Sequence, residues 1–298
     1  MVLRNSCRCL ILSLLCVFQL VVQRDKDYVE VFAGMQAVSN GISSMGYVGS
    51  VIDKDIGGAA HDLLTWDGYL FAIINVLGIK RGGLLWLAPP CGNFIWMSRR
   101  STQRRLDSPL GQGRTAEIAN HLTSRVVFLI WLASCIGVFV IVEQPKSSIL
   151  WEYPDLERLF SELAISSAAV EMGAFGSLAR KPLILKGTAP WLPQISRKCG
   201  RKDRRRIAAC SERCALARRF IDKKGISRTR GNHNLTKSAA YPVAFGKHVG
   251  VEFAKHFLAC RNELSNNTQP VTMEDFKGVP RFELHREGVF DDLWHKIL

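Results

Sequence analysis

Short apolar runs of strand length alternate with longer segments of helical spacing through the first half of the chain. The strand-like runs cover residues 28–33, 47–53, 83–88 and 138–143, and the longest helical segment covers residues 115–135. Strands and helices repeated in this order are typical of a parallel sheet with helices on both faces. With 298 residues, 47% of them hydrophobic, the chain can bury a sizeable core. The sequence therefore predicts an α/β fold with a doubly wound, mostly parallel sheet.

The second half of the chain departs from this alternation. Helical spacing covers residues 155–164, a strand-like run follows Lys181, residues 204–223 suggest a helix, and helical spacing returns at residues 239–257. We divide the chain into an apolar N-terminal segment (1–26), a main domain (27–196), a basic, partly helical insertion (197–236), a helix that returns to the main domain (237–263) and a polar tail (264–298).

The apolar stretch near the N-terminus bears on the compartment. Arg4 and Arg8 precede an apolar run at residues 9–22, which is shorter than the ~20 residues that a membrane span needs. We interpret it as a helix that packs on the main domain, with a secretory signal or an anchor as the alternative. Nine cysteines at irregular spacing favour a reducing compartment. We therefore expect a nuclear or cytoplasmic protein without a stable membrane partner, and secretion or anchoring remains the alternative.

Four residues lie at or just after the ends of the predicted strands: Gly34, Asp53, Cys91 and Glu143. In doubly wound sheets, ligands bind beyond the carboxyl ends of the strands. A glycine in the turn before a helix lets a ligand approach the backbone, and an acid after the second strand commonly accepts hydrogen bonds from a ribose. The alternatives are a tight turn at Gly34 and a solvated turn residue or helix cap at Asp53.

The stretch GGLLWLAPPCGNF places Cys91 where a buried strand ends. Pro89 and Pro90 cannot continue the hydrogen bonding of a sheet, and they keep the loop rigid. A cysteine held in this way suits a nucleophile, and Glu143 at a neighbouring strand end suits a proton donor. The alternatives are a buried structural thiol and a helix-capping acid.

Four stretches resemble, in order and approximate spacing, those of the DNA (cytosine-5) methyltransferases. They are VEVFAGMQAVSNGISSMGYVGSVIDKD, LAPPCGNF, IVEQP and GAFGSLARKPLILKGTAPW, and the resemblance covers roughly residues 28–190. It implies the Rossmann-like fold of class I methyltransferases and S-adenosylmethionine as the cofactor.

The resemblance also implies which residues hold the cofactor. Phe32 and Gly34 match the loop that binds S-adenosylmethionine, and Asp53 matches the acid that holds its ribose. Asp62 resembles the residue near the adenine, and Pro89, beside the nucleophile, completes the cofactor-binding set.

The same resemblance implies the catalytic residues. Cys91 falls on the nucleophile that attacks carbon 6 of cytosine, and Glu143 falls on the glutamate that hydrogen-bonds ring nitrogen 3. Arg180 is similar to the arginine that holds the flipped base or its phosphates, with Lys181 as the alternative.

These roles imply methylation of carbon 5 of cytosine in DNA or RNA. Carbon 5 is too weak a nucleophile to attack a sulfonium methyl group, so a thiolate must first add to carbon 6, and protonation at nitrogen 3 stabilises the adduct. The chain departs from the family at Gly92, where glutamine or asparagine is usual, and at Gln144 and Pro145, where asparagine and valine are usual. The alternative is therefore a catalytically inactive nucleic-acid-binding protein that retains the fold.

Positive charge is concentrated between residues 197 and 230. This stretch holds fourteen Lys and Arg against three acids, a net +11 of the chain's formal +14. Such a segment predicts contacts with the phosphates of DNA or RNA, with a nuclear import signal or a solvated charge run as the alternatives. The arginines expected to contact nucleic acid are Arg99, Arg100, Arg104, Arg201, Arg204, Arg205 and Arg206.

A metal site is not predicted. Cys199, Cys210, Cys214 and His233 could be grouped as a zinc set, but their spacing matches no standard finger. The sequence does not indicate an oligomeric state.

Overall fold

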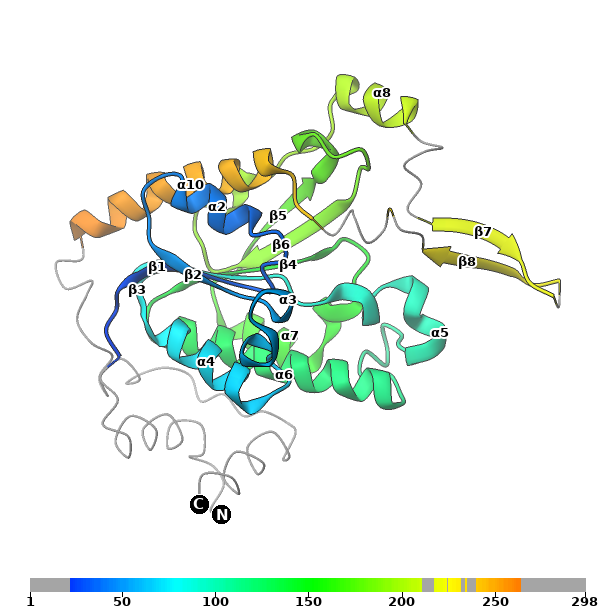
Figure 1. Ribbon diagram of the computed structural model, residues 1–298, viewed down its shortest axis with the longest axis horizontal. Coiled ribbons are helices and arrows are strands. Elements are labelled where there is room, and N and C mark those ends of the chain that lie inside the picture. Colours follow the sequence, from blue (N-terminus) through cyan, green and yellow to red (C-terminus); the bar gives the residue numbers. More distant parts are fainter. Residues whose placement is uncertain (1–21, 211–216, 224, 232–233, 235–239, 264–298) are drawn as a thin grey trace, which may run out of the picture.

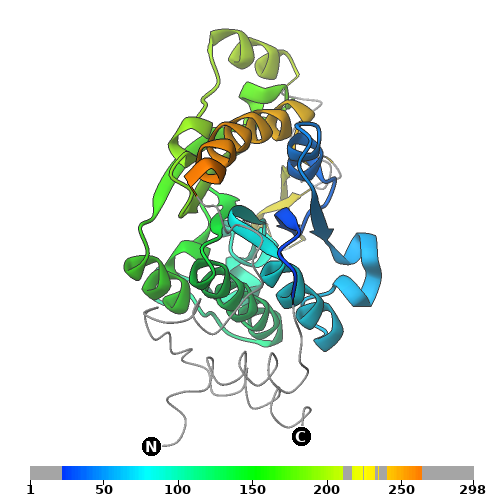
Figure 2. The same ribbon diagram turned by 90° about the vertical axis from the view of Figure 1, so that its left-hand side faces the viewer.

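The computed structural model describes residues 22–210, 217–223, 225–231, 234 and 240–263. Residues 1–21 of the apolar N-terminal segment lie outside this part of the chain, as do the tail at 264–298, Cys214 and His233. Within the described part, a six-stranded sheet lies between two layers of helices (Figure 1, Figure 2).

The strands of this sheet follow the order β2-β1-β3-β4-β6-β5. Their bounds are β1 Lys26–Val31, β2 Gly49–Ile52, β3 Ile79–Leu87, β4 Phe139–Pro145, β5 Ser166–Glu171 and β6 Pro182–Gly187. β1 pairs in parallel with β2 and β3, β3 pairs in parallel with β4, and β6 runs antiparallel to its neighbours β4 and β5. The ends of β1 to β5 and the start of β6 therefore lie at one edge, which we call the carboxyl edge.

The predicted α/β fold with a mostly parallel sheet and helices on both faces is confirmed, and the sheet is compatible with a Rossmann-like fold. The strands predicted in the first half all form, with small shifts in their bounds, and the run after Lys181 forms β6. β5 was not predicted, because its sequence SSAAVE has no apolar run. The helix predicted at residues 204–223 is wrong: it ends at Ala209, and residues 217–221 form a strand.

Helices of varied length connect these strands. The α-helices are α2 Ala37–Ser43, α3 Lys54–Gly57, α4 Trp66–Leu77, α5 Arg99–Thr102, α6 Arg114–Cys135, α7 Pro154–Glu162, α8 Arg201–Ala209 and α10 Val243–Glu263. The short 3-10 helices are η1 Gly58–His61, η2 Cys91–Asn93, η3 Trp96–Ser98, η4 Ile149–Glu152, η5 Met172–Phe175 and η6 Leu192–Ile195.

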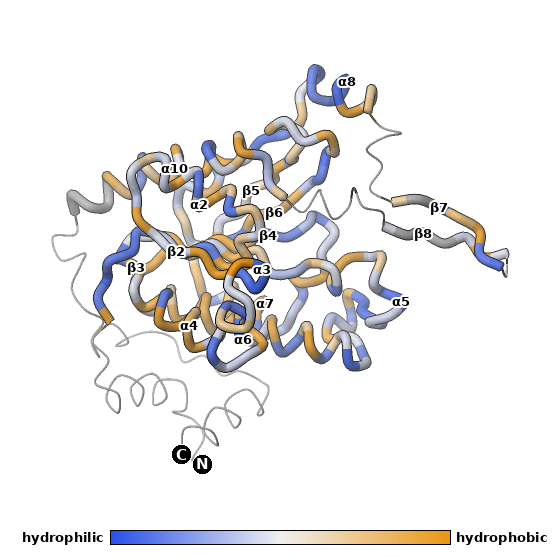
Figure 3. The backbone as a smooth tube through the Cα atoms, viewed as in Figure 1, coloured by the Kyte–Doolittle hydropathy of each residue, from blue (hydrophilic) through white to orange (hydrophobic). Residues whose placement is uncertain are grey.

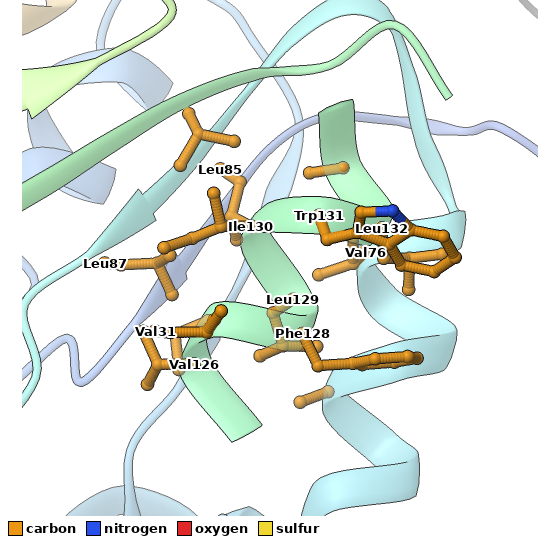
Figure 4. Close-up of a cluster of buried hydrophobic side chains, with 14 of the residues drawn as sticks. Val31, Val76, Leu85, Leu87, Val126, Phe128, Leu129, Ile130, Trp131 and Leu132 are labelled. Carbon is orange, nitrogen blue, oxygen red and sulfur yellow. The ribbon is translucent and has the colours of Figure 1, made fainter. Parts of the chain in front are cut away.

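Helices α4, α6 and α7 cover one face of the sheet through an apolar interface. The strand residues on this face are Val29, Val31, Leu85, Leu87, Val140 and Val142. Figure 4 shows α6 side chains such as Ile130 and Leu132 between β3 and α4. Full burial of one such aliphatic side chain contributes about 1.5–3 kcal/mol to folding. In the described part of the chain, α6 is also the helix long and apolar enough to cross a membrane, and most of it is buried inside the protein.

Helices α2 and α10 cover the opposite face (Figure 2). Gly41 of α2 meets Gly246 and Gly250 of α10, and a Cβ atom at any of these positions would overlap the backbone of the other helix. The missing side chains therefore allow the two backbones to touch. The helical spacing at residues 239–257 corresponds to α10, which fastens the far end of the described chain to the sheet.

The basic segment lies to one side of these layers. It forms α8 and an antiparallel hairpin of β7 (Ala217–Ile221) and β8 (Ser227–Gly231), which projects from the body of the protein (Figure 1). Hydrophilic residues are concentrated at α8 and at the tip of the hairpin, whereas the interior of the sheet is hydrophobic (Figure 3).

Candidate active site

Cys91 and Glu143 lie at the ends of two neighbouring parallel strands. In the pairing of β3 with β4, Leu87 lies opposite Val142, so Glu143 is the next residue on β4 and Cys91 begins η2 shortly after β3. The charge of Glu143 acts on the thiol of Cys91. The structure therefore brings together the two side chains that the sequence placed at this edge.

Glu143 is a buried carboxyl group with one strong hydrogen bond. It is 7% exposed, and Tyr241 Oη donates a hydrogen bond of 2.6 Å to its Oε2 atom. Burial raises the pKa of Glu143 above its usual value, although the ammonium of Lys181 and the hydroxyl of Tyr241 act in the opposite direction. A carboxyl group with a raised pKa keeps a proton more readily, which suits a proton donor.

Cys91 is a free, half-buried thiol. Burial raises the pKa of Cys91, the carboxylate of Glu143 raises it further, and the ammonium of Lys181 lowers it. The thiolate is the nucleophilic form of cysteine. Because the two groups repel each other when both are ionised, Cys91 ionises more readily while Glu143 is neutral.

Lys181, rather than Arg180, is the cation at this pair. Lys181 directly precedes β6, and its charge acts on both Cys91 and Glu143. The guanidinium of Arg180 instead binds the carboxylate of Glu171, with Nε 2.8 Å and Nη2 2.5 Å from Oε1. This geometry favours the alternative, Lys181, as the cation at Cys91 and Glu143, and the assignment of Arg180 to the catalytic set stays a prediction.

Pro89 and Gln144 fasten the two strand ends to each other. Gln144 Nε2 donates a hydrogen bond of 2.6 Å to the backbone oxygen of Pro89, and Ser148 Oγ donates one of 2.8 Å to Gln144 Oε1. Gln144 is fully buried, so these bonds satisfy its amide where water cannot reach it. The residue that departs from the family pattern therefore fixes the loop that carries Cys91. Sequence reasoning missed this role because a contact to a backbone oxygen has no motif.

The turn after β1 and the end of β2 are joined through Asp53. The amide of Gly34 donates a hydrogen bond of 2.9 Å to Asp53 Oδ2, and the amide of Asp55 donates one of 2.8 Å to Oδ1, which caps α3. Gly34 has a left-handed backbone (φ 49°), and a Cβ atom there would meet nothing within 4 Å. Phe32, at the same strand end, is also left-handed (φ 61°), which is uncommon for a bulky residue. The space over this turn is therefore open to a ligand.

Asp62 shapes the turn before α4. Its Oδ1 atom accepts a hydrogen bond of 2.9 Å from the amide of Leu64, and Thr65, which caps the helix, donates from its hydroxyl to the backbone oxygen of Asp62 at 2.9 Å. The structure thus shows a turn-forming role for the residue that the resemblance placed near the adenine.

Glu30 is a buried carboxyl group that sequence reasoning missed. It lies on β1 with no exposed surface, and its Oε2 atom accepts hydrogen bonds from the amide (2.8 Å) and the hydroxyl of Ser39. Its Oε1 atom has no hydrogen-bond partner among the described residues. Burial raises the pKa of Glu30 to about 7. The signal that could have revealed it is the single acid inside the apolar run YVEVFA.

Most of the arginines expected to contact nucleic acid are exposed. They are Arg99 and Arg100 on α5, and Arg201, Arg204 and Arg205 on α8.

Arg104 and Arg206 are held by the protein itself. Arg104 is 1% exposed, lies 4.1 Å from the ring centre of Phe94, and donates to Asn120 Oδ1 at 2.9 Å. This burial corrects the expectation that Arg104 contacts nucleic acid, because the side chain supports the loop after Cys91. Arg206 is partly exposed and donates to the backbone oxygens of the turn after β5, at 2.6–2.9 Å, so it anchors α8.

In the described residues, no group of three or more His, Cys, Asp or Glu could hold a metal ion. Fold and site together define an α/β protein whose chemically active side chains gather at the carboxyl edge of its sheet. No family model matches this chain, and no curated protein matches it either.

Proposed function

We propose that this protein is an S-adenosylmethionine-dependent methyltransferase that methylates carbon 5 of cytosine in nucleic acid through a covalent adduct with Cys91. The observation that carries the proposal is the meeting of Cys91, Glu143 and Lys181 at the ends of β3, β4 and the start of β6. A nucleophile, an acid and a cation are the groups that addition of a thiolate to a pyrimidine ring uses.

The electrostatics of the three groups fit this addition. With Glu143 protonated, Lys181 favours the thiolate of Cys91, which adds to carbon 6 of the ring. The electron pair moves to nitrogen 3, which takes the proton of Glu143 and leaves a carboxylate. Negative charge thus passes from Cys91 to Glu143, and Lys181 interacts with both. The adduct makes carbon 5 nucleophilic.

The residues at the ends of β1 and β2 fit the cofactor. The open turn at Gly34 gives a ligand access to the backbone, Asp53 offers carboxylate oxygens to ribose hydroxyls, and Phe32 lies beside the turn. Asp62 and Pro89 would complete the contacts. When bound, S-adenosylmethionine supplies an electrophilic methyl group. The left-handed backbones of Phe32 and Lys181 (φ 37°) mark both parts of this edge as strained, which is frequent at functional sites.

The exposed arginines fit a nucleic-acid substrate. α5 follows Cys91 in the chain, so Arg99 and Arg100 lie on the segment that leaves the nucleophile, and α8 adds three more exposed arginines. Contacts between such cations and phosphates release counterions and can offset the few kcal/mol that extrusion of a base costs.

An inactive nucleic-acid-binding protein is the second candidate function, and the state of Cys91 favours it. Burial and Glu143 both raise the pKa of the thiol, so the resting protein keeps Cys91 protonated. In the inactive protein, the exposed arginines bind nucleic acid, and Cys91 forms no adduct with cytosine.

Covalent trapping with 5-fluorocytosine separates the two candidates. DNA and RNA oligonucleotides that carry 5-fluorocytosine are incubated with the protein and S-adenosylmethionine, and adducts are resolved under denaturing conditions. We expect an adduct for the wild type, none for Cys91→Ser, and an undiminished adduct for the matched control Cys210→Ser, which changes another partly exposed free cysteine. Binding of both oligonucleotides and of S-adenosylhomocysteine without any adduct would identify the inactive protein. If calorimetry detects no binding of S-adenosylhomocysteine, the proposal that S-adenosylmethionine is the cofactor is overturned.

A further inference from the structure

Tyr241 reaches the candidate proton donor from a distant part of the chain. Its hydroxyl donates the 2.6 Å hydrogen bond to Glu143 Oε2, across 98 positions of sequence. This bond engages one of the two carboxyl oxygens of Glu143. Tyr241 therefore fixes Oε2, and Oε1 lies outside this bond.

The ring of Tyr241 is held from two sides. Phe245, in the first turn of α10, packs against it edge to face at 5.2 Å, and the Nζ atom of Lys181, which precedes β6, lies 5.5 Å from the centre of the Tyr241 ring. Phe245 is in turn fixed by Trp86 of β3 and by Phe175, at ring distances of 6.0 and 5.3 Å. Edge-to-face contacts of this kind define ring orientation as well as burying area. These ring contacts and the hydrogen bond to Glu143 together hold the hydroxyl of Tyr241 in place.

The helix behind Tyr241 is fixed as well. α10 can lie this close to α2 because Gly246 and Gly250 allow its backbone to touch that of α2 at Ala37 and Gly41. This contact fixes the position of α10 beside α2 and helps to hold the start of α10, which Tyr241 precedes.

The hydroxyl of Tyr241 keeps its proton. Burial, followed by the charge of Glu143, raises the pKa of Tyr241 well above its ordinary value, and Glu30 on β1 acts in the same direction. Tyr241 is thus a permanent donor, and the charged groups that face it are Glu143, Lys181 and Glu30.

We propose that Tyr241 is a positioning residue that holds the carboxyl group of Glu143 so that its second oxygen faces nitrogen 3 of the extruded cytosine. This role rests on the proposed function. A donor to the carboxylate also favours its charged form, so loss of the hydroxyl leaves Glu143 protonated to a higher pH. Neutral Glu143 no longer repels the thiolate, and Cys91 then ionises at a lower pH.

Two readouts on Tyr241→Phe test this role. The first is the rate of adduct formation with the 5-fluorocytosine oligonucleotide, which we expect to fall about 10- to 100-fold with unchanged oligonucleotide affinity, because misplacement of a catalytic group by about 1 Å costs rate rather than binding. The second is the pH dependence of Cys91 alkylation by iodoacetamide, followed by peptide mass spectrometry, whose midpoint we expect to move to lower pH. The second readout does not require methyl transfer.

The matched control is Tyr153→Phe, which removes a buried phenol that interacts with Ser124 and Asn120 in the other helical layer. It should move neither readout. In a Glu143→Gln background, Tyr241→Phe should add no further shift of the alkylation midpoint. Equal midpoints for Tyr241→Phe and Tyr153→Phe, or a full additional shift in the Glu143→Gln background, would overturn the role of Tyr241. An alkylation shift without any adduct in the wild type would overturn the proposed function and leave the contact between Tyr241 and Glu143 established.

Discussion

The two faces of the central sheet differ in what their strands present. Toward α4, α6 and α7, the hydrophobic core residues of β1, β3 and β4 are valine, leucine and isoleucine, and the buried Asp27 and Gln144 lie near the ends of β1 and β4. Toward α2 and α10, the same strands show Tyr28, Glu30, Trp86 and Glu143 among their buried residues. Burial of a carboxyl group costs free energy, whereas burial of an aliphatic side chain yields it. The comparison teaches that one face stabilises the fold and that the other carries its chemistry at some cost in stability.

The largest effect that we predict belongs to the apolar face. Leu85→Ala removes a fully buried side chain of β3 from the α6 interface, and the cavity should lower the free energy of unfolding by about 2–5 kcal/mol, measured by urea denaturation. The alkylation midpoint of Cys91, measured below the unfolding transition, should stay at the wild-type value. A shifted midpoint would mean that the two faces are not separable.

The sequence predicted the apolar face better than the polar one. Runs such as GLLWLA and VFVIVE have the length and composition of buried strands, and this pattern was enough to place β3 and β4 side by side with Cys91 and Glu143 at their ends. Hydrophobic pattern is local, so it can be read from one stretch of chain.

The partners of these residues could not be predicted in the same way. Tyr241 and Gln144 act through single hydrogen bonds whose geometry depends on the packing of α10 and of the loop at Pro89. The choice between Arg180 and Lys181 depends on which of two adjacent side chains turns toward β4, and the sequence left it open. β5 was missed because small residues pair with β6 at that strand without an apolar signal.

A second prediction concerns the pH dependence of stability, which we expect to come from the buried carboxyl group of Glu30 on the face toward α2 and α10. The pKa of Glu30 is raised by burial from 4.5 to about 7, so between these values the folded protein binds a proton that the unfolded chain has released. The free energy of unfolding should therefore fall as pH rises from 4.5 to about 7 and stay low above it. Glu30→Gln removes this loss and should stabilise the protein at pH 8 by on the order of 3 kcal/mol.

Ser39→Ala is the paired variant for this experiment. The hydroxyl and the amide of Ser39 both lower the pKa of Glu30, so loss of the hydroxyl should raise that pKa and extend the fall in stability above pH 7. Thermal unfolding at a series of pH values measures both variants. A flat profile for the wild type from pH 5 to 8 would contradict a buried Glu30 that titrates with the raised pKa.

The smallest effect that we predict concerns the glycine contact on the polar face. Gly246→Ala places a methyl group against the backbone oxygen of Ala37, so α10 must move away from α2. Overpacking of this kind costs about 1–3 kcal/mol, and the better helix propensity of alanine offsets up to about 1 kcal/mol, so the net loss in urea denaturation should be about 1–2 kcal/mol. Val243→Ala, at a position that is 70% exposed on the same helix, is the control and should be close to neutral.

The Gly246→Ala variant also sharpens the comparison between the faces. The added methyl group meets Ala37 of α2 and lies far from Cys91 in sequence, yet it shifts the helix that Tyr241 precedes. If the polar face acts as one unit, its Cys91 alkylation midpoint should move in the direction of Tyr241→Phe, although Leu85→Ala, which costs more stability, leaves that midpoint in place. The opposite outcome is a larger shift of the alkylation midpoint in Leu85→Ala, the less stable variant, than in Gly246→Ala. It would show that Cys91 responds to general loosening of the fold and not to the position of α10.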